Sequence, residues 1–168
     1  MNNKIDDMAV VALGSNLAGK FASIEGLLEA ALARMAEAGL AVRARSSWWR
    51  STSWPDLTAP DYLNGVTLVE PTLSPETMLA RLRGIEAAFG RVRMNVNAPR
   101  TLDLDLIAHG RSRRSDPELT LPHPRAADRL FVMGPLAEIA PDWIHPVFGE
   151  TVSVLARKAS VGRDARPI

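Results

Sequence analysis

The sequence predicts an α+β fold in which two helices pack against an antiparallel sheet in the order β-α-β-β-α-β. Two observations carry this prediction. Short apolar or alternating segments, typical of strands, are interrupted by two longer segments whose apolar residues recur with helical spacing. The chain beyond residue 109 is rich in proline and less periodic. We therefore expect one domain over residues 1–168, a ferredoxin-like sandwich with its helices on one face and a C-terminal extension wrapping the sheet.

The first half of the pattern is a strand, a helix and a second strand. Residues 9–13 form an apolar run that predicts a buried strand. Residues 21–38 have apolar positions at helical spacing, and Gly39 can end that helix. Residues 40–49 predict the second strand. The next ten residues, 51–60, hold two prolines and small polar residues, which is typical of a loop.

The second half repeats the pattern in the order strand, helix, strand. Residues 62–69 alternate, so Tyr62, Asn64, Val66 and Leu68 share one face of a strand. Ser74 followed by proline is a helix start, with serine as the N-cap and proline at the first helical position. That helix ends at Gly90, and a loop then leads to a fourth strand at residues 101–108.

Composition excludes several classes of protein. The chain has 168 residues, of which 46% are hydrophobic and 23% charged, a balance that suits one globular domain. It contains no cysteine, which excludes disulfides and thiolate chemistry. The first residues lack the basic-then-apolar order of a signal peptide, and no apolar run is long enough to span a membrane. We therefore expect a cytoplasmic protein, and we also expect a monomer. The net charge of +1 gives no field that would draw the chain to nucleic acid or to a membrane, so we expect it to bind neither.

The fourth strand carries the strongest chemical signal. Asp103 and Asp105 alternate with leucines, so both carboxylates lie on one face about 7 Å apart, although aspartate is disfavoured in strands. Such a pair repels itself unless a cation lies between, and hard oxygen ligands suit one or two magnesium ions shared with substrate phosphates. Arg91, Arg93 and Arg100 precede the pair, and arginines beside acidic metal ligands are typical of a polyphosphate site.

A glycine-rich motif near the N-terminus is a weaker candidate for a phosphate-binding site. Residues 14–20 spell GxxxxGK between a strand and a helix, as in a phosphate-binding P-loop. The next residue is Phe21, which lacks the hydroxyl that would bind magnesium. We interpret the segment as a strand-to-helix turn, with Ser15 or Asn16 near the helix start.

Two further groups of residues fit a ligand with phosphates and a ring. His123 and Arg129 lie in a proline-restricted segment from which both could reach a phosphate. Aromatic faces stack a flat heterocycle and an asparagine amide pairs with its edge. The candidates for that role are Trp54, Tyr62, Asn64 and Phe131.

These segments together resemble the 6-hydroxymethyl-7,8-dihydropterin pyrophosphokinase family of folate biosynthesis. The resemblance runs in family order from about residue 9 to 155. Its most specific part is the string from Pro99 to Leu106, PRTLDLDL, with GRVR upstream at residues 90–93. The other matching stretches are ALGSNL at 12–17, YLN at 62–64, LPHPR at 121–125, RLFV at 129–132 and PLAEIAPD at 135–142.

The resemblance implies an activity and a role for each residue. Members transfer the β,γ-pyrophosphoryl group of ATP to the pterin hydroxymethyl oxygen and release AMP. By resemblance, Asp103 and Asp105 hold two magnesium ions and are catalytic together with Arg91 and Arg100. The implied ATP-binding residues are Glu86, Arg91, Arg93, Arg100, His123 and Arg129. The implied pterin-binding residues are Ser51, Thr52 and Trp54, through backbone groups, and Tyr62, Asn64 and Phe131, through side chains.

Two other functions stay open from the sequence. A metal-dependent nucleotidyl transferase or cyclase also places aspartate pairs on a ferredoxin-like sheet, although Tyr62 and Asn64 argue against it. A non-catalytic RNA-binding sheet would need exposed aromatics on its central strands, where this sequence has aspartates.

Overall fold

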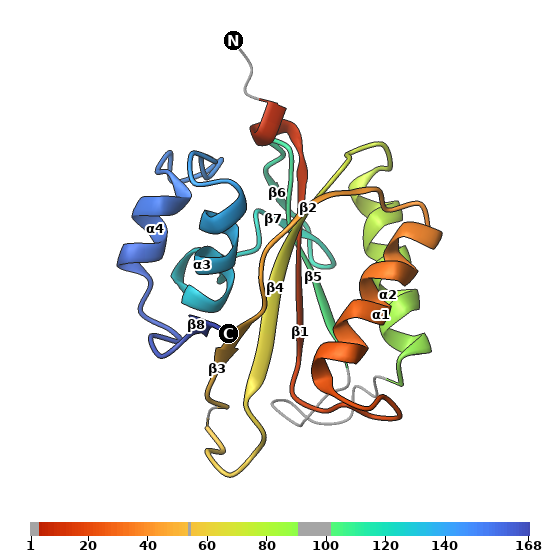
Figure 1. Ribbon diagram of the computed structural model, residues 1–168. Helices are drawn as coiled ribbons and strands as arrows, with labels where there is room; N and C mark the ends of the chain where they lie inside the picture. The colour runs from red at the N-terminus through yellow and green to blue at the C-terminus, as the bar shows by residue number, and fades with distance from the viewer. Residues whose placement is uncertain (1–3, 54, 91–101) are drawn as a thin grey trace.

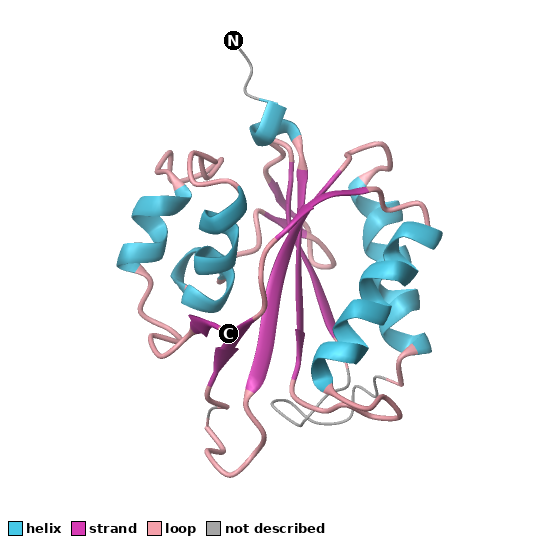
Figure 2. Ribbon diagram, viewed as in Figure 1, coloured by secondary structure: helices cyan, strands magenta, loops and turns pink. Residues whose placement is uncertain are grey.

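The computed structural model describes residues 4–53, 55–90 and 102–168 and shows an antiparallel sheet between two helical layers (Figures 1 and 2). One layer contains α1 (Ile24–Glu37) and α2 (Pro75–Ala88), and the other contains α3 (Leu130–Ile139) and α4 (Val152–Lys158). The two helices predicted on one face of the sheet lie there. The C-terminal extension, expected to wrap the sheet, covers the other face, but it does so as the helices α3 and α4, which the sequence does not predict.

Strand β1 (Ala9–Ser15) is the centre of the sheet. It pairs antiparallel with β4 (Tyr62–Val69) on one side and with β5 (Asp103–His109) on the other. All seven residues of β1 are buried, because a helical layer covers each face. The sheet order among the described residues is β5-β1-β4-β3-β8, and β2 also pairs with β4.

The remaining elements are short. They are β2 (Val42–Arg45), β3 (Trp49–Ser51), β6 (Arg114–Ser115), β7 (Thr120–Leu121), β8 (Arg166–Pro167) and the 3-10 turns η1 (Lys4–Asp7) and η2 (Ala126–Asp128).

The alternation of apolar residues along the strands separates two hydrophobic cores, one on each face of the sheet. Leu63 of β4 and Leu104 of β5 pack toward α1 and α2. Val66 lies two residues after Asn64 on β4 and therefore on the same face, and it packs toward α3 and α4. The face of β4 that carries Tyr62 and Asn64 is therefore the face that the C-terminal helices cover.

The predicted second strand is two strands separated by a bend. β2 ends at Arg45 and β3 begins at Trp49, and Ser46 completes the ladder between them. Its backbone N–H donates to the Val66 carbonyl at 2.9 Å, and its hydroxyl accepts from the Val66 N–H at 3.0 Å. A side-chain oxygen thus takes the place of a strand carbonyl at this point.

Two consecutive tryptophans at the bend face opposite layers. Trp48 is buried above Gly65 and donates its indole N–H to Glu29 of α1 at 3.1 Å. Trp49 packs on Gly134 of α3. In both places a glycine is required, because a Cβ there would lie about 2.5 to 2.6 Å from the indole ring.

The helix starts follow the capping rules, but one lies later than the sequence predicts. The hydroxyl of Ser74 accepts from the Thr77 N–H and caps α2, as expected. Helix α1 begins at Ile24 with Ser23 as its N-cap, so Ser15 and Asn16 do not lie at the helix start. Asn16 is instead buried and donates to the hydroxyl of Ser53 and to the Pro60 carbonyl, each at 3.4 Å.

The longest described helices, α1 and α2, have 14 residues each, and none of the described helices is long and apolar enough to cross a membrane.

We predict that Ser46→Ala lowers the free energy of unfolding by about 1 to 3 kcal/mol, because the buried Val66 N–H loses its acceptor. Urea unfolding followed by circular dichroism measures the change. Ser47→Ala, one residue further and exposed, is the control and should cost less. Equal losses for the two variants would show that the hydroxyl of Ser46 is not needed in the ladder.

Candidate active site

One row of residues crosses the sheet from β5 to β3. In the registers of the three ladders, Gly14 lies opposite Asp103 on one side and opposite Asn64 on the other, and Asn64 lies opposite Trp49. Directly paired residues in antiparallel strands project from the same face. The register therefore aligns the carboxylate expected to bind metal with the amide expected to bind a heterocycle.

Gly14 is the residue without a side chain in this row. A Cβ on Gly14 would lie 2.6 Å from Oδ1 of Asn64, which is closer than unbonded atoms approach. The Asn64 side chain therefore occupies the space that any larger residue at position 14 would need. Glycine at this position leaves room for the Asn64 amide beside β1.

The two aspartates fit the chemistry of a magnesium site. Asp103 and Asp105 are half-buried on one face of β5, next to Gly14 and Ala12 of β1. No group of three or more acidic, histidine or cysteine side chains able to hold a metal occurs among the described residues. Two carboxylates are nevertheless what magnesium commonly takes from a protein when phosphates and waters complete its octahedron.

A cavity of about 290 Å³ lies at the outer edge of β5. Three residues expected to bind ATP or metal line it together: Glu86 of α2, Asp105 and His123. Glu86 is only 3% exposed, and its carboxylate accepts from the Leu104 N–H at 3.0 Å, which satisfies an outward-facing amide of the edge strand. This contact ties α2 to the strand that carries the aspartates.

His123 joins the cavity to the aspartates. Its backbone N–H donates to the Ile107 carbonyl of β5 at 2.8 Å, and the Arg125 N–H donates to its Nδ1 at 3.2 Å. We assign the proton of the neutral ring to Nε2 on that basis. Burial lowers the pKa of His123, and the charges of Arg129 and Arg125 lower it further against the opposing effect of Asp103. A neutral Nε2–H is a suitable donor to a phosphate oxygen.

The other side of the row holds the polar residues expected to bind the heterocycle. The amide nitrogen of Asn64 lies 3.5 Å from the hydroxyl of buried Ser51, which pairs with Tyr62 in the ladder of β3 and β4. Thr52 follows β3 and is exposed, and both its N–H and its hydroxyl donate to the carboxylate of Asp164. Tyr62 is half-buried at the start of β4.

Arg129 and Phe131 lie together at the start of α3. The Arg129 guanidinium lies 5.7 Å from the centroid of the Phe131 ring, a cation–π distance. Phe131 also packs against the core between the sheet and α3. The structure thus brings a predicted phosphate-binding residue and a predicted ring-binding residue onto one helix terminus.

Four predicted site residues lie outside the described residues: Trp54, Arg91, Arg93 and Arg100.

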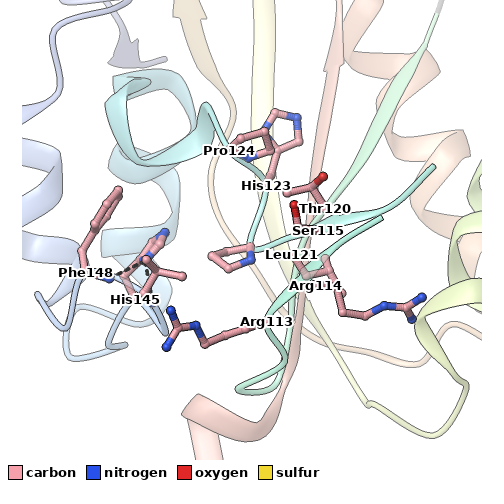
Figure 3. Close-up of a pocket in the computed structure, with 11 residues that line it drawn as sticks. Arg113, Arg114, Ser115, Thr120, Leu121, His123, Pro124, His145 and Phe148 are labelled. Atoms are coloured by element: carbon pink, nitrogen blue, oxygen red, sulfur yellow. Dashed lines mark hydrogen bonds between the residues drawn. The ribbon is translucent and has the colours of Figure 1, made fainter. Parts of the chain in front are cut away.

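A second cavity, of about 340 Å³, is also lined by His123 and its neighbours Thr120 and Pro124 (Figure 3). Its wall includes the stacked rings of His145 and Phe148 and the side chains of Arg113 and Arg114. His145 is buried and accepts from the N–H groups of Val147 and Phe148, which is a structural role. None of the residues in the row from Asp103 to Trp49 lines this cavity.

Comparison with known proteins identifies the family. The model of the 7,8-dihydro-6-hydroxymethylpterin-pyrophosphokinase (HPPK) family matches residues 10–141. The chain belongs to this family.

Curated relatives agree with the HPPK model. A 2-amino-4-hydroxy-6-hydroxymethyldihydropteridine pyrophosphokinase of Synechocystis sp. is 44% identical over 145 residues, 86% of this chain and 72% of the relative. The folic acid synthesis protein fol1 of Pneumocystis carinii is 35% identical over 99% of this chain, which spans only 22% of that longer protein.

A solved structure supports the fold. The wild-type HPPK-DHPS of Plasmodium falciparum matches with a TM-score of 0.69 and 12% identity, over 96% of this chain and 48% of that chain.

The sequence assigns no role to two residues that the structure places beside candidate site residues. Gly14 belongs to the glycine-rich turn and to the ALGSNL stretch of the family resemblance, and the structure places it between Asp103 and Asn64 in the sheet. Asp164 lies more than 20 residues beyond the family match and still holds Thr52. The strand register could have pointed to Gly14, whereas no sequence signal pointed to Asp164.

We predict that Gly14→Ala weakens pterin binding about tenfold and leaves the fold intact, because the new methyl group displaces only the Asn64 amide. Calorimetric titration with the pterin gives the affinity, and the midpoint of thermal unfolding reports the fold. Gly84→Ala is the matched control: nothing lies within 4 Å of its Cβ, so that variant should bind pterin normally and be slightly more stable. Unchanged affinity in Gly14→Ala would mean that the position of the Asn64 amide does not matter.

Proposed function

We propose that this chain transfers the β,γ-pyrophosphoryl group of ATP to the hydroxymethyl oxygen of 6-hydroxymethyl-7,8-dihydropterin, giving AMP and the pterin diphosphate for folate biosynthesis. Its curated relatives are named pyrophosphokinases, and the chain is an enzyme of that class. The observation that carries the proposal is the cross-strand row, in which Gly14 separates Asp103 from Asn64. It supports a phosphate side on β5 and a heterocycle side on β4 of one surface.

We also propose that residues 1–168 form a single domain with a ferredoxin-like core. The order β5-β1-β4-β2, with α1 and α2 on one face, supports that description. The second layer of α3 and α4 would be an addition to this core.

On the phosphate side, ATP would bind along the cavity at the edge of β5. Glu86 and His123 line this cavity beside Asp105, and Arg129 lies close enough to His123 to lower its pKa. Neutral His123 would donate to a phosphate oxygen, and Arg129 would supply positive charge. Arg91, Arg93 and Arg100, by their place in the sequence, would complete the binding of the triphosphate.

Asp103 and Asp105 would hold magnesium, two ions by the resemblance. Bound there, the metal would neutralise phosphate charge and favour loss of the hydroxymethyl proton. The two carboxylates would fix the position of the metal and, through it, the position of the phosphates. They lie on a strand packed against helices, which would hold this position rigidly.

On the heterocycle side, Asn64 would pair with the edge of the pterin, and Tyr62 and Phe131 would enclose its ring. Ser51, Thr52 and Trp54 would form the wall beyond the edge. Ser51 and Asn64 are already within 3.5 Å of each other, which supports a shared polar surface at this end of β4.

The chemistry asked of the protein is mainly positioning. The hydroxymethyl oxygen displaces AMP from the β-phosphorus in line, the new P–O bond forms as the bond to the AMP oxygen breaks, and the hydroxyl proton is lost. His123, Arg129, Arg91 and Arg100 would neutralise charge on the phosphates as they move.

A nucleotidyl transferase or cyclase is not favoured by the family match, and one assay separates it from the proposal. The protein is incubated with ATP, magnesium and the pterin, and the nucleotide products are resolved by chromatography. AMP that appears only with pterin supports pyrophosphoryl transfer. Release of pyrophosphate instead would overturn it.

We predict that Asp103→Ala and Asp105→Ala each lower turnover at least a hundredfold. Each variant would lose magnesium, and the negative charge on the phosphates would then not be neutralised. Initial rates of AMP release at saturating magnesium give the comparison. Asp142→Ala, which removes an exposed carboxylate from the loop after α3, should be near normal. A near-normal rate in either site variant would contradict the metal assignment.

We predict that Asn64→Ala weakens pterin binding by about 1 to 3 kcal/mol, because the polar edge of the heterocycle is left unpaired. Binding of an ATP analogue, measured by the same calorimetric method, is the internal control and should change little. Equal losses for nucleotide and pterin would make Asn64 a structural residue.

A further inference from the structure

The C-terminal segment, residues 160–168, contacts both sides of the proposed pterin site. It follows α4 and lies beyond residue 141, where the match to the family model ends. Two of its residues meet residues that the proposal places around the pterin ring: Gly162 contacts Phe131, and Asp164 contacts Thr52.

The first contact holds the start of α3. Val161 donates its N–H to the Asp128 carbonyl and accepts from the Leu130 N–H, each at 2.9 Å. The carboxylate of Asp128 in turn accepts from the N–H and the hydroxyl of Ser160, at 2.9 and 2.7 Å. These four hydrogen bonds fix the backbone on either side of Arg129.

Gly162 brings the segment against the Phe131 ring. A Cβ on Gly162 would lie 2.5 Å from Cδ1 of Phe131, and its φ of +71° is in the region that favours glycine. The backbone therefore touches one edge of the ring. The orientation of Phe131 depends on where this glycine is held.

The second contact holds the end of β3. Asp164 accepts from the Thr52 N–H at 2.7 Å and also from the Thr52 hydroxyl. Beyond it, β8 pairs with β3, and the Ile168 N–H donates to the Trp48 carbonyl at 3.0 Å. Because the peptide group is planar, a carboxylate bound to the Thr52 N–H fixes the orientation of the whole peptide between Ser51 and Thr52.

The two contacts are close together along the chain. Only Arg163 separates Gly162 from Asp164, so their Cα atoms are at most about 7 Å apart. The Gly162 carbonyl also accepts from the Ala165 N–H at 2.9 Å, which closes a turn over residues 162–165. Phe131 and Thr52, 79 residues apart in the sequence, are thereby held by one short, hydrogen-bonded turn.

We propose that this turn sets the spacing between the Phe131 and Thr52 sides of the pterin site, and that Asp164 is a positioning residue for pterin binding. The assignment rests on the proposed function, since it takes Ser51, Thr52 and Phe131 to be pterin contacts. Asp164 acts through Thr52 and does not touch the phosphates. Its effect should therefore fall on the pterin and not on ATP, whose proposed cavity lies at the other edge of the sheet, beside β5.

The exposure of the pair separates positioning from stability. Asp164 and Thr52 are both exposed, and exposed polar pairs contribute little to the free energy of unfolding. Breaking the contact should leave the fold nearly as stable while the peptide at Thr52 gains freedom. A change in substrate affinity without a change in stability is the signature of this role.

The experiment compares steady-state kinetics of Asp164→Ala, Asp164→Asn and the natural chain. We expect Asp164→Ala to raise the KM for pterin about tenfold, with the KM for ATP within twofold and the midpoint of thermal unfolding within a few degrees. Asp164→Asn keeps an oxygen that can accept from Thr52 and should recover most of the pterin affinity. Thr52→Ala removes the hydroxyl from the other end of the contact and should raise the KM for pterin part of the way.

The control is Asp142→Ala, which removes an exposed carboxylate from the loop after α3 and should leave both KM values unchanged. If the natural chain releases AMP with pterin and Asp164→Ala has the same KM for pterin, the positioning role is wrong and the proposed function stands. Parallel losses for pterin and ATP with lower stability would also overturn the role. Absence of pterin-dependent AMP from the natural chain would overturn the proposed function, and this assignment with it.

Discussion

The pairing of β1 along both of its edges is the constraint on which the site depends. A strand that is buried on both faces cannot slip by one residue, because every side chain would then move to the wrong core. The registers of β4 and β5 against β1 are therefore fixed by packing of the two cores. The alignment of Asp103, Gly14 and Asn64 follows from that packing and needs no contact among the three residues. Stability and site geometry thus have one physical origin here.

The local elements could be predicted from the sequence because their signals are local. The alternation of residues 62–69 gives the bounds of β4, and Ser74 with Pro75 gives the start of α2. The bend at Ser46 could not be predicted, since it depends on a hydroxyl that meets the Val66 N–H 20 residues away. The second helical layer was missed for a related reason. Helix α3 is apolar on most sides and contains Pro135, so its sequence lacks the periodicity of a surface helix.

The site divides in the same way. Asp103 and Asp105 are candidates from the sequence because two aspartates in a strand of leucines are unusual, and Asn64 is one because it shares a face with Tyr62. What joins these residues is long-range: the carboxylate of Glu86 bound to the Leu104 N–H, and His123 bound to Ile107 through the backbone. A partner of this kind leaves no pattern in a single sequence, because either residue alone is ordinary. Asp164 is the extreme case, since its contact with Thr52 spans 112 positions.

The order of residues across the sheet also limits how the two substrates can meet. Neighbouring strands lie about 4.8 Å apart, so the Cα atoms of Asp103 and Asn64 are separated by about 10 Å with Gly14 between them. Under the proposed function, a ring whose edge pairs with Asn64 would have to span this distance for its hydroxymethyl group to reach phosphates held at Asp103. A side chain at position 14 would displace the Asn64 amide from the row and so change the point from which that distance is set. The proposed reaction therefore depends on strand spacing, which the two cores fix, and on a glycine that leaves room for the amide.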